Sequence, residues 1–240
     1  MKNSRCFIIT GCHRGGTSLT SHLCYKMGMF FGEKEYLIEP DFSNTDGYYE
    51  NREFTTLNDN ILQAAGGAWY NPPGRDAIDN VIPQYIDRVK KLIEKHKSNF
   101  WGIKDPRLSY AFPIYKPYLE DINIILIKRD RSEVINSIYR THIGSIPTEY
   151  RTKERIGWLY DEYMSRGQEL ADNYPSIELF FEKYFSSPDN EIKKLANFLR
   201  YDGDMASIKP IIKPELRHFE AGAKKKSRRF KIYCEIEEIL

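Results

Sequence analysis

The feature that most constrains this chain is the segment at residues 6–28, CFIITGCHRGGTSLTSHLCYKMG, in which an apolar run leads into a glycine-rich loop. The continuous run Phe7–Ile9 is typical of a strand buried on both faces within a parallel sheet. Beyond the loop, apolar residues recur at helical spacing, at Leu19, Leu23 and Met27. A strand, a glycine loop and a helix N-terminus in this order direct backbone N–H groups and the positive end of the helix dipole toward one point. The segment therefore predicts a phosphate-binding loop.

The loop departs from the template of nucleotide kinases, G-x-x-x-x-G-K-[ST], at its cation. It keeps Gly11, Gly16 and Ser18. Thr17 stands where the lysine belongs, and the nearest cation is Arg14. Without that lysine the γ-phosphate charge of a nucleotide lacks compensation, which argues against a P-loop kinase and leaves it as the alternative. Sulfuryl transfer needs less compensation, because a transferring sulfonate carries less negative charge than a transferring phosphoryl.

Composition limits the classes of protein to which the chain can belong. The chain has 240 residues, 41% of them hydrophobic and 29% charged, as is typical of a globular protein, and we expect a single domain over residues 1–240. No apolar stretch is long enough to cross a bilayer, and the polar start MKNSR lacks signal-peptide architecture, so we expect no membrane partner. The four cysteines show no CxxC or secreted-framework spacing, which favours a cytoplasmic location. A net charge of +2 is too small to indicate a nucleic-acid partner.

Further strands and helices are predicted along the chain. Apolar runs predict strands at residues 100–103, 122–128 and 177–181, and helical patterns cover residues 51–66, 81–93, 134–139, 151–173 and 192–199. Asp130 and Glu133 predict a capping box at the start of the third of these helices. In an open α/β sheet, residues just past the strand ends face the ligand crevice. Lys104 and Arg129 both lie at such positions.

The loop GCHRGGTSL resembles the 5′-phosphosulfate loop of sulfotransferases that use 3′-phosphoadenosine-5′-phosphosulfate (PAPS). The resemblance implies a three-layer α/β/α fold of the P-loop NTPase type with a central parallel sheet, PAPS as cosubstrate, 3′,5′-ADP (PAP) as product, and no metal. It also implies that the 5′-phosphosulfate is held by Arg14, Gly15, Gly16, Thr17 and Ser18, with Arg14 as a catalytic cation. Gly15 stands where the family usually has serine, which removes one hydroxyl.

A second motif resembles the 3′-phosphate signature of the same family. Arg129 follows the clearest strand, and seven residues separate it from Ser137. An arginine at a strand end supplies a forked, permanent charge, and the following helix adds its dipole. The later segment FFEKYFSSPDNEIKKLANFLR also resembles the family and places Phe181 where a tyrosine commonly contacts adenine. Phe181 either stacks on adenine or belongs to the core, and both interpretations stay open.

Candidates for the chemistry come from two further stretches. Lys104 lies in KDPR, which resembles the tyrosylprotein sulfotransferases, where the corresponding lysine stabilises the transition state. The cytosolic branch has a histidine base near this place, but Pro106 occupies the matching position here. We therefore expect a carboxylate base, as in the tyrosylprotein and several bacterial branches. Glu50 is the first candidate because GYYE immediately precedes a helix, and Glu35 is the second because its spacing from Arg14 is closer to that of the tyrosylprotein branch.

The sequence constrains two things least, the role of the C-terminal tail and the identity of the acceptor. The run KKKSRRFK at residues 224–231 holds six cations in eight positions. It resembles the basic loop that closes over the 3′-phosphate, and we assign it through Lys225 to the cofactor or to an anionic acceptor, with a solvated turn as the alternative. The acceptor is expected to carry a hydroxyl or amine on a small molecule, a carbohydrate or a peptide. An inactive relative that binds PAP without turnover is a further alternative, and the oligomeric state is not predicted.

Overall fold

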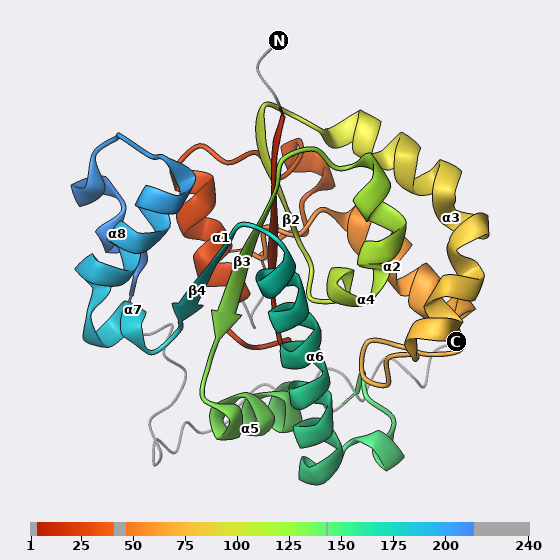
Figure 1. The fold of residues 1–240 in the computed structure, drawn as a ribbon. Coiled ribbons are helices and arrows are strands. Elements are labelled where there is room, and N and C mark those ends of the chain that lie inside the picture. The colour runs from red at the N-terminus through yellow and green to blue at the C-terminus, as the bar shows by residue number, and fades with distance from the viewer. Residues whose placement is uncertain (1–3, 41–46, 143, 214–240) are drawn as a thin grey trace, which may run out of the picture.

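The computed structural model describes residues 4–40, 47–142 and 144–213. Within these residues the central sheet has four strands, all parallel, in the order β2-β1-β3-β4 (Figure 1). The strands are β1 (Arg5–Gly11), β2 (Phe100–Lys104), β3 (Ile122–Lys128) and β4 (Ser176–Phe180). The parallel sheet that the sequence predicted is confirmed.

Helices cover both faces of this sheet (Figure 1). One face carries α1 (Thr17–Lys26), α7 (Lys183–Ser186) and α8 (Pro188–Leu199). The other group contains α2 (Arg52–Ala64), α3 (Arg75–His96), α4 (Leu108–Tyr115), α5 (Arg131–Thr141) and α6 (Lys153–Asn173). Short 3₁₀ turns complete the connections: η1 (Lys34–Tyr36), η2 (Lys116–Tyr118), η3 (Thr148–Tyr150), η4 (Met205–Ser207) and η5 (Lys209–Ile211). None of the helices in the described ranges combines the length and the apolarity that crossing a membrane requires.

The central strand β1 shows why the molecule has three layers. Side chains of a strand point alternately to its two faces. Cys6 and Ile8 pack into the apolar cluster formed with α2 to α6, whereas Phe7 and Ile9 pack into the cluster formed with α1 and α8. All four side chains are fully buried. The continuous apolar run therefore fills two cores at once, as expected for a parallel strand covered on both sides.

The predicted element boundaries are mostly confirmed, with three corrections. The strand predicted at residues 122–128 has those bounds. The strand predicted at 177–181 ends at Phe180, so Phe181 lies just beyond it. The sequence analysis predicted no element directly after Pro106, but α4 begins two residues beyond it, because Asp105 O and Pro106 O accept the first turn's N–H groups from Leu108 and Ser109.

The third correction concerns the capping box. The Asp130 side chain accepts a hydrogen bond from Glu133 N–H at 2.9 Å, as predicted. The reciprocal bond is absent from the described contacts, because Asp130 N–H donates instead to Glu182 Oε1 at 2.9 Å. The Glu133 carboxylate is turned toward Arg129, where its oxygen lies 3.0 Å from Nη2.

The carboxyl ends of β1, β2 and β3 meet at one edge of the sheet, because the strands are parallel neighbours. At this edge Gly11 approaches β3 so closely that a Cβ atom would lie 2.5 Å from the carbonyl oxygen of Ile127. Only glycine allows this approach. The glycine loop, the KDPR segment and Arg129 therefore start from adjacent points.

Candidate active site

The glycine loop, residues 11–16, turns sharply between β1 and α1. Arg14 and Gly16 have left-handed φ angles of 62° and 95°, and Gly15 N–H donates to Cys12 O at 2.9 Å. A Cβ atom on Gly15 would lie 2.7 Å from that same oxygen, so glycine rather than the usual serine fits this turn. Gly16 precedes the first turn of α1, and no side chain caps that helix among the described contacts. Its first N–H groups are therefore available to an anion.

Phe181 packs against the glycine loop at Gly16. Its side chain is only 4% exposed, and a Cβ atom on Gly16 would lie 2.2 Å from its ring. The guanidinium of Arg129 lies over the ring, 4.3 Å from its centroid. Of the two interpretations of Phe181, this placement favours the core residue over the adenine platform, because the ring is already covered by Gly16 and Arg129.

The two arginines of the predicted phosphate site meet at the loop. Arg129 is buried, and its Nη1 donates to the carbonyl oxygen of Arg14 at 3.1 Å. Arg14 Nε in turn donates to Ser137 Oγ at 3.3 Å, from the loop to α5. The structure thus brings Arg14 together with Arg129 and Ser137, which lie 115 and 123 positions away in sequence. Arg129 holds the backbone of Arg14 in its left-handed conformation.

A second cluster is centred on Lys104, at the end of β2. Its side chain is almost fully buried and forms an ion pair with Glu50. Its Nζ also donates to Ser18 Oγ at 3.3 Å, in the first turn of α1. Glu35, the alternative base, is exposed on η1, and the described contacts do not join it to this cluster. The structure therefore places Glu50, and not Glu35, beside the loop and the lysine.

The residues after Lys104 form a buried network that the sequence analysis did not identify. Asp105 is fully buried and accepts hydrogen bonds from Arg107 Nε at 2.8 Å and from Asn58 Nδ2 at 2.8 Å. Arg107 also pairs with Asp59 at 2.8 Å. Burial lowers the pKa of Arg107, but the carboxylates of Asp105, Glu50 and Asp59 outweigh it and raise the pKa above its ordinary value. The one signal in the sequence was the pair of opposite charges flanking Pro106.

Two histidines flank the Trp69 ring near the loop. The ring centroids of His13 and His142 lie 4.8 Å and 5.0 Å from that of Trp69. Burial, reinforced by nearby cations of which Arg107 is the first, holds the pKa of His13 well below its ordinary value. Burial and the charge of Arg14 lower the pKa of His142 to about 4. Both imidazoles are therefore neutral at pH 7.

The titration of His142 predicts a pH dependence of stability. Its pKa is about 4 in the folded chain and 6.5 ordinarily, so between these values the unfolded chain binds the proton more readily. The free energy of unfolding should therefore fall as the pH drops from 6.5 to 4, by up to about 3 kcal/mol from this group. Denaturant unfolding at pH 7, 5.5 and 4.5 measures the slope. His142→Gln should reduce this slope, and His13, whose pKa is also lowered, should account for part of the slope that remains. An unchanged slope would contradict the assignment to His142.

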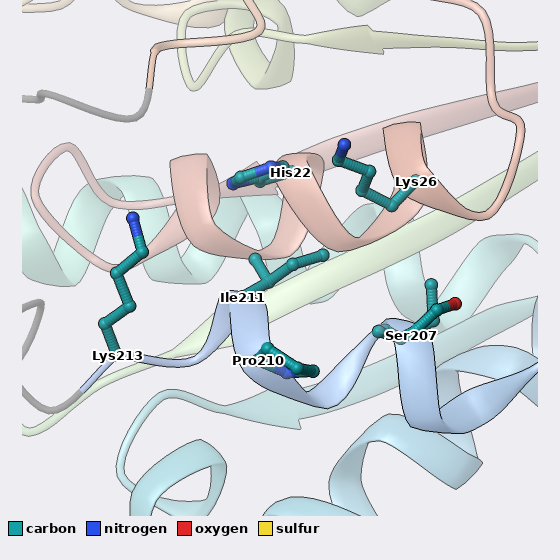
Figure 2. Close-up of a pocket in the computed structure, with 7 residues that line it drawn as sticks. His22, Lys26, Ser207, Pro210, Ile211 and Lys213 are labelled. Atoms are coloured by element: carbon teal, nitrogen blue, oxygen red, sulfur yellow. The ribbon is translucent and has the colours of Figure 1, made fainter.

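A groove of about 380 Å³ lies beside α1, between His22 and Lys26 on one side and the segment 207–213 on the other (Figure 2). Lys26 borders it on the side of α1, and Pro210, Ile211 and Lys213 lie on the opposite side. None of the candidate site residues lines this groove, so it has no part in the chemistry assigned below. Lys225 and the basic run 224–231 lie outside the described residues.

The chain is similar to known proteins both in sequence pattern and in fold. A model of the sulfotransferase family matches residues 7–204. No curated protein matches the sequence of the chain. Solved structures resemble it in fold, among them the sulfotransferase domain from the curacin biosynthetic pathway, with 13% identity, a TM-score of 0.50, and coverage of 91% of this chain and 81% of that one.

Two more solved structures are similar at lower scores. The sulfotransferase domain of the olefin synthase from Synechococcus PCC 7002 has 16% identity and a TM-score of 0.49, covering 94% of this chain and 92% of that one. A structure named as a sugar kinase from Janibacter sp. HTCC2649 has 10% identity and a TM-score of 0.46, covering 87% and 98%. Because the family model spans most of its length, this chain belongs to the sulfotransferase family.

Proposed function

We propose that this protein transfers the sulfuryl group of PAPS to a hydroxyl or amine of an acceptor and releases PAP. The observation that carries the proposal is the cluster of Lys104, Glu50 and Ser18 beside the glycine loop. It places a cation and a carboxylate, both largely buried, at the sheet edge where ligands of α/β proteins bind. An enzyme that moves a proton and stabilises developing negative charge needs such a pair.

Two features support PAPS as the donor. The left-handed loop and the uncapped start of α1 suit an anion such as the 5′-phosphosulfate, and Arg14 supplies the nearest charge. Arg129 and Ser137 meet Arg14 on the side of α5, which suits a second anionic group, the 3′-phosphate. Two neighbouring cationic positions fit a ligand that carries two phosphate groups.

The roles of the residues follow from their contacts. PAPS supplies the electrophilic sulfur and leaves as PAP, which keeps the bridging oxygen and its electron pair. As the oxygen or nitrogen of the acceptor bonds to the sulfur, Glu50 accepts the proton that this atom loses. Such general-base catalysis is worth roughly 10²–10⁴-fold in rate. Lys104 lies between Glu50 and Ser18, so it orients the base and stabilises negative charge on the sulfonate and the leaving phosphate together with Arg14.

Thermal unfolding with PAP, with ATP and magnesium, and without ligand tests the donor. PAP at 100 times its dissociation constant should add about 2.7 kcal/mol to the free energy of unfolding and raise the melting temperature by several degrees. ATP with magnesium should give a smaller shift, since the loop lacks the lysine of a kinase. A shift with ATP and magnesium alone would support the kinase instead.

Arg129→Ala should remove most of the PAP shift, because a charge contact to the 3′-phosphate is lost. Arg131→Ala is the matched control: Arg131 lies two residues away, but its side chain is 51% exposed and pairs with Asp161 on the surface. Its removal should leave the PAP shift intact. Equal effects of the two variants would contradict the assignment of Arg129.

A further inference from the structure

The guanidinium of Arg129 is already compensated in the free protein. Its Nε and Nη2 lie 3.2 Å and 3.0 Å from Glu133 Oε2, and its Nη1 donates to Arg14 O. The Phe181 ring covers one face, and the side chain is 7% exposed. An anion that binds Arg129 therefore approaches an existing ion pair and not a lone cation.

Among the described contacts, the Glu133 carboxylate bonds to no residue other than Arg129. The capping box would have turned it back to Asp130 N–H, but that donor is taken by Glu182. The cap of α5 uses the backbone N–H of Glu133 and the side chain of Asp130, so it does not depend on the Glu133 carboxylate. Arg129 is the one ion-pair partner that the described residues give to Glu133.

Two effects of Glu133 on ligand binding oppose each other. Its hydrogen bonds orient the guanidinium before a ligand arrives, which favours binding. Its negative charge repels an incoming phosphate at short range in a poorly solvated site, which disfavours binding. Glutamine at this position keeps an oxygen that accepts the same hydrogen bonds and removes the charge. The substitution therefore separates the two effects.

We propose that Glu133 is a competing counter-ion that weakens the hold of Arg129 on the 3′-phosphate of PAP and so eases release of the product. The inference rests on the proposed function, because it takes Arg129 as a 3′-phosphate contact. It assigns to the first turn of α5 a control over affinity in addition to its helix cap. A buried arginine without such a partner would also leave an uncompensated charge in the free protein.

Titration calorimetry of the wild type and Glu133→Gln with PAP and with adenosine 5′-phosphate tests this inference. The variant should bind PAP about tenfold more tightly, because the repulsion is removed while the guanidinium stays oriented. Adenosine 5′-phosphate lacks the 3′-phosphate, so its affinity should not change. The matched control Glu94→Gln removes the same charge from an exposed position on α3 and should alter neither affinity.

Unchanged or weaker PAP binding by Glu133→Gln would overturn the counter-ion role. An equal gain for adenosine 5′-phosphate, or for Glu94→Gln, would also overturn it, since it would reveal a general charge effect. Failure of the proposed function looks different: the wild type and the variant would both fail to bind PAP, and the inference would fall with it.

Discussion

Replacing Asp105 with alanine is expected to lower the free energy of unfolding by about 3–5 kcal/mol. Its carboxylate is fully buried and accepts from the Arg107 side chain at 2.8 Å, from Arg107 N–H at 3.0 Å and from Asn58 at 2.8 Å. The substitution leaves a buried guanidinium with one carboxylate partner, Asp59, which is itself partly exposed. The loss is large because an arginine does not neutralise itself by releasing its proton.

Chemical denaturation followed by circular dichroism measures this loss. Asp161→Ala is the control, since it removes a carboxylate that also holds an arginine at 2.8 Å, but with side chains 51% and 57% exposed. That surface pair should contribute no more than about 1 kcal/mol. If the two variants lose the same stability, the buried network does not hold the KDPR segment in place.

Glu50→Gln is expected to reduce the rate of sulfuryl transfer by roughly 10²–10⁴-fold. The glutamine oxygen can still accept a hydrogen bond from Lys104, so the lysine keeps its place near Ser18. It cannot accept the acceptor's proton at neutral pH, so the loss falls on turnover. The PAP-induced rise in melting temperature should persist, because the contacts proposed for the two phosphates do not include Glu50.

Transfer of labelled sulfate from PAPS to an acceptor found by screening measures the rate. Glu35→Gln makes the same chemical change at the exposed alternative on η1 and should leave the rate within about twofold, as for a surface substitution away from the site. A loss with Glu35→Gln and none with Glu50→Gln would exchange the two roles. Loss of PAP binding in Glu50→Gln would instead indicate a distorted loop.

Local sequence carried much of the fold. The run at β3, the glycine loop before α1 and the Asp130 cap each depend on neighbours a few residues away, so their patterns were sufficient. The helix α4 was missed because Pro106 indicates a break by itself. In the folded chain Pro106 lies in a tight turn whose carbonyl groups start the next helix.

The buried network around Asp105 could not be predicted from the sequence, and the reason is different. Asn58 and Asp105 are 47 positions apart, and nothing in either local pattern indicates that α2 lies against the end of β2. The same holds for the reciprocal half of the capping box, since Glu182 comes from the segment after β4 and takes the donor that Glu133 was expected to use.

The sequence by itself determined the family resemblance, the parallel sheet and the set of charged residues at the strand ends, because these follow from periodicity and from motifs of adjacent residues. Only the tertiary structure shows that Glu50, and not Glu35, lies beside Lys104, and that the Phe181 ring is buried. Both placements depend on which side chains are buried against Lys104, Gly16 and Arg129. Burial and pairing of a charge are set by distant segments brought together by folding, and no local pattern encodes them.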